Sequence, residues 1–233
     1  MGERRLRVSI AEAPLAHHFE DLKQQHNTGT LGMWVFLATE VMFFGGVFTA
    51  YAVLRARFPA DFTAASRQLY IWIGAANTAV LLTSSLTMAL ALYSVRGGRQ
   101  RQLVSFLGLT LFLGAVFLGV KMTEYYIDYQ EDLIPGPTFS VQSEGWAKAA
   151  EGTGRPVDRA HAQMFFVFYF FLTLLHATHM VVGMVIMAIQ LVRARRGQYT
   201  AIYTMPIELM GLYWHFVDII WVFLFPLLYL VRD

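Results

Sequence analysis

Ionisable side chains interrupt the apolar runs of this 233-residue sequence, and they are the residues best suited to chemistry. Glu40 lies near the middle of the run that begins at Leu31. By insertion scales, an ionisable group at such a depth in a bilayer costs roughly 2.5–3.5 kcal/mol. Two interpretations stay open for this buried carboxyl: it relays protons, or it is neutral and hydrogen-bonds a neighbouring helix. The second is preferred.

Three histidines stand in later apolar runs. His176 and His179 are three residues apart and therefore share one face of a helix. A haem or metal site would need matching ligands on another helix, and there only His215 is available. We therefore predict that His176 and His179 are hydrogen-bonded packing residues, and that the chain holds neither haem nor metal.

The last apolar run carries a second buried carboxyl, Asp218. His215 and Asp218 lie on one face of the expected helix, and Trp214 and Trp221 complete an i, i+4, i+7 pattern with Asp218. An aspartate at this depth must find a partner or stay protonated. A proton path is one reading, and a structural hydrogen bond to another helix or subunit is the slightly favoured one.

Charged residues also mark the ends of two runs. Lys121 and Glu124 can pair at i, i+3, and we expect them to extend toward the headgroup zone as an anchor, with Glu124 as a polar packing residue. Arg193 and Arg196 lie one turn apart at the end of the fourth run. Arginine geometry suits phosphate. We predict a phospholipid headgroup site formed with the start of the next helix; its members are Arg193, Arg196, Glu208, Trp214 and His215.

The elements that must position these residues are long apolar segments. Hydrophobic residues make up 56% of the chain and charged residues 15%, below the ~25% that is typical of soluble domains. A spanning helix needs about 20 mainly apolar residues. The sequence therefore predicts an all-α integral membrane protein with five transmembrane helices in one bundle, at about residues 31–54, 69–95, 103–126, 163–192 and 209–230.

The connections between the runs set the topology. A polar arm, residues 1–30, precedes a transmembrane domain that spans 31–231. Two short loops are rich in arginine, whereas the loop 127–162 is long and slightly acidic. Because basic loops stay inside, we predict the N-terminus inside and the C-terminus outside. A net charge of +2 gives no reason to expect a nucleic-acid partner, and the absence of cysteine excludes disulfides and thiolate-bound clusters.

Four of these segments also resemble a known family. They are Gly32–Phe44 with its glutamate, Glu124–Tyr126, the two-histidine stretch Phe171–Gly183, and Tyr213–Leu224. All four, in this order, are similar to motifs of the cytochrome c oxidase subunit III family of haem-copper terminal oxidases. The similarity covers about residues 25–231, and its last motif is the most specific. The commonest members have seven helices, and this chain resembles only their last five, as a five-helix bacterial form does.

The resemblance implies a non-redox accessory subunit of a proton-pumping cytochrome c oxidase in the respiratory chain of a bacterial cytoplasmic membrane. Haems and copper would belong to partner subunits I and II, and this chain would have no catalytic residue and no cofactor of its own. It would pack mainly against subunit I, hold structural phospholipid, and support stable turnover and proton uptake. Subunit II, small subunits or a respiratory supercomplex are further expected partners.

Two other functions stay open. Subunit III of a quinol oxidase and the accessory protein of nitric oxide reductase share the same architecture. The Trp-His-Phe-Val-Asp run at 214–218 favours the cytochrome c branch, although the electron donor itself binds elsewhere in the complex. A small proton-coupled transporter that uses Glu40 and Asp218 belongs to a different class. Transporters often show inverted repeats and broken helices. The apolar runs here are unbroken and odd in number, which makes the transporter the least favoured function.

Overall fold

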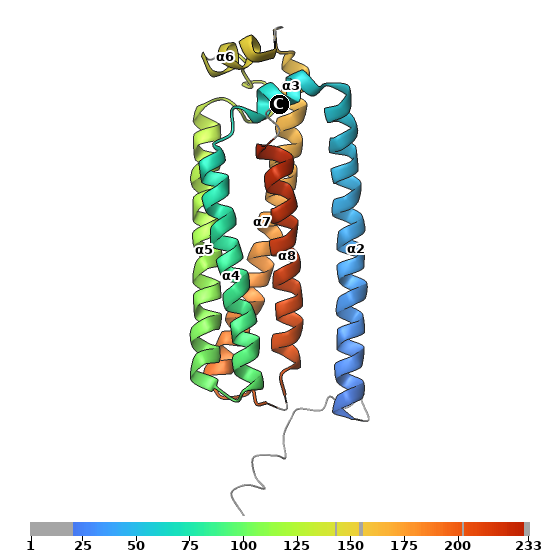
Figure 1. Cartoon of the computed structure of the whole chain (residues 1–233), viewed down its shortest axis with the longest axis vertical. Helices are drawn as coiled ribbons and strands as arrows, with labels where there is room; N and C mark the ends of the chain where they lie inside the picture. Colours follow the sequence, from blue (N-terminus) through green and yellow to red (C-terminus); the bar gives the residue numbers. More distant parts are fainter. Residues whose placement is uncertain (1–20, 143, 154–155, 202, 231–233) are drawn as a thin grey trace, which may run out of the picture.

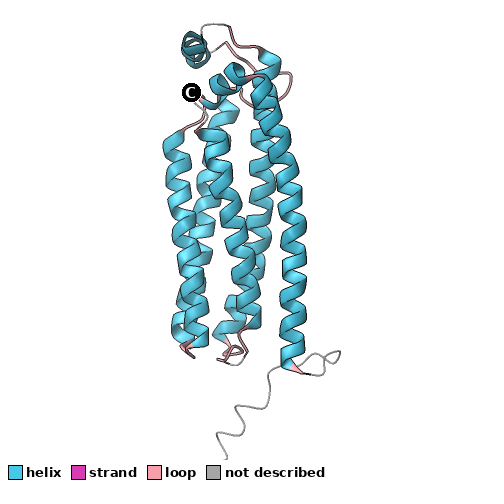
Figure 2. Ribbon diagram, turned by 45° about the vertical axis from the view of Figure 1, so that its right-hand side comes forward, coloured by secondary structure: helices cyan, strands magenta, loops and turns pink. Residues whose placement is uncertain are grey.

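A computed structural model of the chain describes residues 21–142, 144–153, 156–201 and 203–230. Within these ranges the protein is helical and contains no strand (Figure 2). Five helices are long and apolar enough to cross a membrane, as predicted. They are α2 (Leu22–Arg57), α4 (Ile71–Arg96), α5 (Gln100–Gln130), α7 (Arg159–Arg195) and α8 (Met205–Tyr229).

Most of these helices extend beyond the apolar segments that predict them. The first helix begins at Leu22 rather than Leu31, because the Asp21 side chain accepts a hydrogen bond from the Gln24 N–H at 2.6 Å and caps a polar first turn. Asp158 caps α7 in the same way. Hydropathy detects only the part of a helix that lies in lipid, so polar ends of this kind are missed.

The long helices run side by side, and the bundle has two different ends (Figure 1). At one end lie the start of α2 and the short connections from α4 to α5 and from α7 to α8. In these connections Gly98 and Gly197 adopt φ of 67° and 73°, the left-handed region that glycine occupies without strain. The opposite end carries two short helices, α3 (Pro59–Ser66) and α6 (Glu144–Thr153), and the end of α8.

Helix α3 is fixed to α7 by a buried carboxylate. Asp61, only 2% exposed, accepts a hydrogen bond from the Asp158 N–H at 3.1 Å and contacts the His161 ring nitrogen at 2.9 Å. Nearby, the Tyr70 hydroxyl donates to Glu131 at 2.8 Å, and this bond to a carboxylate raises the pKa of the Tyr70 phenol. This end is therefore an ordered cap over the bundle.

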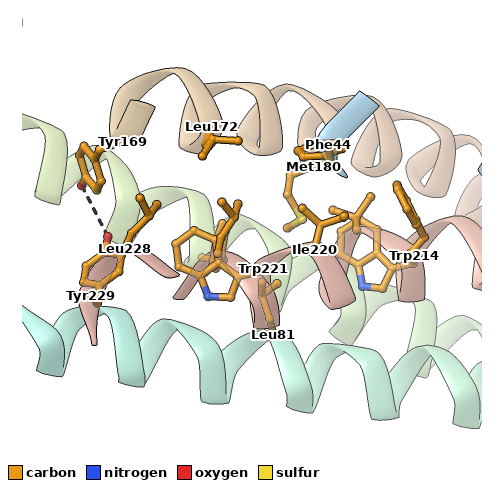
Figure 3. Close-up of a cluster of buried hydrophobic side chains, with 14 of the residues drawn as sticks. Phe44, Leu81, Tyr169, Leu172, Met180, Trp214, Ile220, Trp221, Leu228 and Tyr229 are labelled. Carbon is orange, nitrogen blue, oxygen red and sulfur yellow. Dashed lines mark hydrogen bonds between the residues drawn. The ribbon is translucent and has the colours of Figure 1, made fainter. Parts of the chain in front are cut away.

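Helix α8 forms the centre of the core, whereas α2 stands at its edge (Figure 1). Half of the most apolar stretch of α8 is buried, against 11% for α2. Figure 3 shows Trp214 and Trp221 along α8, packed between neighbouring helices. Their indole N–H groups donate to Ser84 at 3.0 Å and Thr78 at 3.1 Å on α4. Each tryptophan thus packs its ring among apolar side chains and still satisfies its indole N–H with a hydrogen bond.

Candidate functional site

Glu40 and His179 form the one polar contact that joins the edge helix to α7 in the middle of the described bundle. The Glu40 carboxyl Oε2 lies 3.2 Å from His179 Nε2. The other ring nitrogen, Nδ1, lies 2.9 Å from the Leu175 carbonyl, which can only accept. Nδ1 therefore carries a proton. For the contact between Nε2 and Glu40 to be a hydrogen bond, a second proton must be present, carried either by Nε2 or by the Glu40 carboxyl.

The surroundings of this pair are aromatic. The Phe44 ring lies 5.5 Å from the His179 ring, and the Tyr213 hydroxyl donates to the His179 carbonyl at 2.9 Å. Glu40 and His179 keep 20% and 17% of their side chains exposed. Within this chain Glu40 is therefore only partly buried, because α2 packs at the edge of the bundle and leaves one flank of the pair uncovered.

His176 packs as an aromatic ring and does not share the role of His179. Its side chain is 1% exposed, and its ring lies 5.5 Å from the ring of Phe117 and 5.2 Å from that of Trp221. Neither ring nitrogen has a hydrogen-bond partner among the described residues. The predicted hydrogen bond of His176 is therefore not formed there. A three-residue step rotates a helix by about 300°, so neighbours on one face can still meet different surroundings.

A buried ionic network, Lys121–Glu124–Asp128 with Tyr169 and Tyr229, lies toward the capped end of the bundle. The Lys121 ammonium donates to Glu124 at 2.8 Å, to Tyr229 at 2.9 Å and to Tyr169 at 3.3 Å. These three acceptors match its three N–H groups. Each phenol also donates a hydrogen bond to a carboxylate: the Tyr229 hydroxyl donates to Glu124 at 2.6 Å, and the Tyr169 hydroxyl donates to Asp128 at 3.1 Å.

The network is enclosed by rings and closed to solvent within the chain. Lys121 and Glu124 are 3% and 1% exposed. The ammonium also lies 5.0–5.6 Å from the ring centroids of Tyr125, Tyr169, Trp221 and Tyr229, distances at which an aromatic face attracts a cation. The predicted ion pair therefore forms, but the expectation that its charges extend to the headgroup zone is wrong. The side chains point inward because α7 and α8 supply hydroxyl and ring partners.

Sequence reasoning missed three members of this network. The sequence predicts Asp128 in the outer loop 127–162, but α5 continues to Gln130 and carries Asp128 as a buried residue, 1% exposed. Tyr169 and Tyr229, both 0% exposed, come from α7 and α8. The i, i+4, i+7 relation of Lys121, Tyr125 and Asp128, together with Glu124, is the signal that could have extended the helix.

Asp218 lies in a smaller polar cluster between α4 and α8. It is 2% exposed, and neither carboxyl oxygen makes a well-formed hydrogen bond with a described residue. Ser85 on α4 is close enough to interact with it. The Ser85 hydroxyl is also 2.7 Å from His215 Nδ1. Ser85 is thus a shared neighbour of His215 and Asp218, the two residues that the sequence predicts on one face of α8.

The predicted headgroup site is not assembled as expected. Trp214 is completely buried and bonded to Ser84, so it cannot reach a headgroup. His215 turns to Ser85, and Glu208 pairs with Arg96 at 3.0 Å. Only Arg193 and Arg196 remain exposed at the end of α7. The prediction grouped residues by their order along the chain, but successive turns of α8 carry them down into the bundle.

The chemistry that these clusters allow is the holding and sharing of protons. Within the ranges that the structure describes, no group of three or more His, Asp or Glu side chains could hold a metal ion. His176, His179 and His215 instead lie in three separate surroundings. Fold and site together define a multi-pass helical membrane protein with polar clusters inside its bundle.

Comparison with known proteins narrows this class. Residues 157–232 match the family model described as Cytochrome c oxidase subunit III. Cytochrome c oxidase subunit 3 of Alkalihalophilus pseudofirmus is 28% identical, over 93% of this chain and 93% of that protein. The Bacillus subtilis protein of the same name is 29% identical over 86% and 85%. Cytochrome bo(3) ubiquinol oxidase subunit 3 of Pseudomonas aeruginosa is 29% identical over 97% and 96%. The chain is thus similar to subunit 3 of known terminal oxidases over nearly its whole length, and its C-terminal third matches the subunit III family model.

Proposed function

We propose that this protein is the accessory subunit III of a proton-pumping haem-copper terminal oxidase in a bacterial cytoplasmic membrane. The observation that carries the proposal is the similarity to subunit 3 of known oxidases over nearly the whole length of both chains. The five spanning helices agree with it. In this proposal the chain packs against subunit I, with subunit II and smaller subunits as further partners, and holds structural phospholipid.

The redox centres, in this proposal, lie in the partner subunits. The arrangement of the histidines supports this, because His176 is enclosed by aromatic rings while His179 and His215 are engaged by polar side chains. The chain itself contributes a helical bundle that stabilises its partner and carries the Glu40–His179 pair at the exposed flank of α2. Stable turnover and proton uptake are the activities that this bundle would support.

The experiment compares the complete oxidase with a complex from which this chain has been removed. We expect the depleted complex to keep its haem spectrum and its initial rate of oxygen consumption, and to lose activity faster during sustained turnover. Loss of a haem signal in proportion to the removed chain would contradict a non-redox role. An unchanged lifetime during turnover would contradict the supporting role.

A quinol oxidase is the second candidate, favoured by the similarity to the ubiquinol oxidase subunit of P. aeruginosa. The two candidates differ in the electron donor of the whole complex. Oxygen consumption by the purified complex with reduced cytochrome c, and then with a ubiquinol, separates them. We expect the cytochrome c reaction, on the strength of the Trp-His-Phe-Val-Asp run at 214–218.

A further inference from the structure

At the capped end of the bundle, one histidine contacts both the edge helix and the helix that follows it. Helix α2 ends at Arg57, and after Phe58 the chain continues directly into α3, which packs on α7 (Figure 1). His161, in the first turn of α7, stacks on the Phe58 ring, with the ring centroids 3.6 Å apart and 21° between the planes. Its Nδ1 lies 2.9 Å from the Asp61 carboxylate of α3. A single imidazole therefore joins the corner between α2 and α3 to α7.

Two carboxylates lie beside this imidazole. Asp61 is only 2% exposed, and its other oxygen accepts a hydrogen bond from the Asp158 N–H at 3.1 Å. A carboxylate oxygen of Asp158 lies 3.9 Å from the same ring nitrogen, Nδ1. The His161 side chain keeps 27% of its surface exposed, so the solution at this end can protonate it. A proton gained by His161 thus places a positive charge next to two carboxylates, one of which is buried.

The basic residues at this corner oppose such a charge only weakly. Arg57 lies 5.8 Å from the centroid of the ring on which the imidazole stacks, and it is exposed, so solvent screens its repulsion of a charged His161. Arg159 donates to the Pro137 carbonyl at 3.2 Å. Lys148 belongs to α6, which also packs on α3, and is exposed. The two carboxylates therefore determine the sign of the effect.

We propose that His161, Asp61 and Phe58 form a pH-dependent clamp that holds α2 and α3 on α7, tight when His161 is protonated and looser when it is neutral. Histidine is the side chain that ordinarily changes its charge between about pH 5 and 8. Protonation turns the contact with Asp61 into an ion pair and places a cation over an aromatic face. A neutral imidazole can still donate one weaker hydrogen bond from Nδ1. The stability of this corner is therefore full at low pH and is partly lost as the pH rises through the titration of the histidine.

The clamp matters because α2, among the described residues, has few other polar contacts with the bundle. Near the cap the Tyr51 hydroxyl donates to a carbonyl of α8 at 2.8 Å, a neutral bond. The Glu40–His179 pair lies in the middle of the bundle, away from either solution, and His26 lies 3.8 Å from Glu208 at the opposite end. With the cap on the outside, as predicted, protons released by the oxidase tighten the clamp. That consequence rests on the proposed function, whereas the pH dependence itself does not.

Hydrogen exchange of the α3 backbone amides, in the assembled complex in lipid, tests the clamp. Protection factors are measured at about pH 5.5 and about pH 8.5, on either side of the usual titration of histidine, and are corrected for the intrinsic pH dependence of exchange. We expect α3 to be protected about tenfold more at the lower pH, the difference between a charge-assisted and a neutral hydrogen bond. Amides of α8 around the completely buried Trp221 should show no such difference.

Matched variants separate the charge from the packing. His161→Gln keeps a hydrogen-bond donor and His161→Phe keeps a ring, but neither side chain titrates, so both should remove the pH dependence of α3 protection. Asp61→Asn keeps the size of the side chain without its charge and should remove most of that dependence. Tyr51→Phe is the control, because it deletes a neutral bond from the same end of α2. It should lower the protection by the same factor at both pH values and leave the tenfold difference in place.

Two results in the unaltered chain would overturn the proposal: equal protection of α3 at the two pH values, or higher protection at the higher pH. Neither depends on a variant that assembles. Full pH dependence in both His161 variants would also overturn it, because another group would then be the sensor. A pH-dependent clamp in a complex without a haem-copper subunit would contradict the proposed function and leave this inference intact.

Discussion

At the scale of single residues, the contact of Glu40 with His179 links the edge helix to the bundle. Because Nδ1 of His179 is committed to the Leu175 carbonyl, the contact at Nε2 depends on one shared proton. A glutamine amide at position 40 can still donate to Nε2. About one-fifth of each side chain is also left uncovered on one flank, and in a membrane this flank faces lipid or a partner subunit rather than water.

We therefore expect Glu40→Gln to assemble normally and to keep its proton release per electron. Glu40→Ala should retain less of the chain in the complex, because it opens a void and leaves His179 without its partner, at about 1–3 kcal/mol. Subunit retention, oxygen consumption and proton release are compared for both variants. A fully assembled Glu40→Gln complex with clearly impaired pumping would instead make Glu40 a functional acid.

The Lys121 network gives a second prediction at this scale. Lys121→Met should destabilise the folded chain by about 3–5 kcal/mol, because it leaves the buried Glu124 without its counter-charge. Lys121→Met/Glu124→Gln removes both charges at similar volume and should recover a large part of this loss. Thermal stability of the assembled complex measures both. A double variant that is no more stable than Lys121→Met would show that the ion pair is not what holds these helices.

At the scale of helices, close packing of α7 on α8 depends on Gly183. A Cβ at this position would lie 2.8 Å from the Tyr213 ring and 3.1 Å from the Trp214 ring. These rings are held by hydrogen bonds to the His179 carbonyl and to Ser84, so they cannot move aside easily. Gly114 on α5 approaches Trp214 from the other side. Two glycines thus form the notch that admits the tryptophan.

Gly183→Ala should therefore destabilise the bundle by ~1–3 kcal/mol, the usual cost of overpacking. Gly119→Ala is the control, since a Cβ there meets nothing within 4 Å. The two variants are compared by the temperature at which the purified complex loses this chain. Equal temperatures would mean that α7 and α8 separate readily enough to accept a methyl group.

The same scale shows what the sequence could and could not predict. The five spanning helices follow from long apolar runs, which have one structural solution in a bilayer. Which way a polar residue faces does not follow, because that depends on partners from distant segments. The sequence predicts Trp214 in a headgroup site, yet its indole N–H donates to Ser84, 130 residues away in the sequence, and the ring is buried inside the bundle. The sequence also places Asp128 in a loop, yet in the structure the carboxylate of Asp128 is buried in the bundle and accepts a hydrogen bond from the Tyr169 hydroxyl.

At the scale of the whole molecule, the two ends of the bundle differ in character. One end has basic turns and the exposed Arg101 and Arg195, and the other has the ordered cap of α3 and α6. From the positive-inside rule we predict that the basic end faces the cytoplasm. The apolar flank of α2, which includes Trp34, Val35 and Met42, is exposed and is a surface left for lipid or a partner subunit.

Single cysteines test this orientation, because the chain has none of its own. We expect Gln142→Cys, in the cap, to react with a membrane-impermeant maleimide in intact cells. Gln198→Cys, in the connection between α7 and α8, should react only after the membrane is opened. Both positions are exposed, so accessibility alone does not separate them. The reverse pattern would invert the topology.

The central claim concerns assembly, and purification tests it most directly. The tagged chain is isolated from its native membrane in mild detergent, its partners are identified by peptide mass spectrometry, and haem is quantified before and after the subunits are separated. We expect one haem-copper subunit I for each copy of this chain, and no stoichiometric haem or copper on the chain after separation. A colourless chain that is purified without a haem-copper subunit would contradict the account, as would haem that remains with the separated chain.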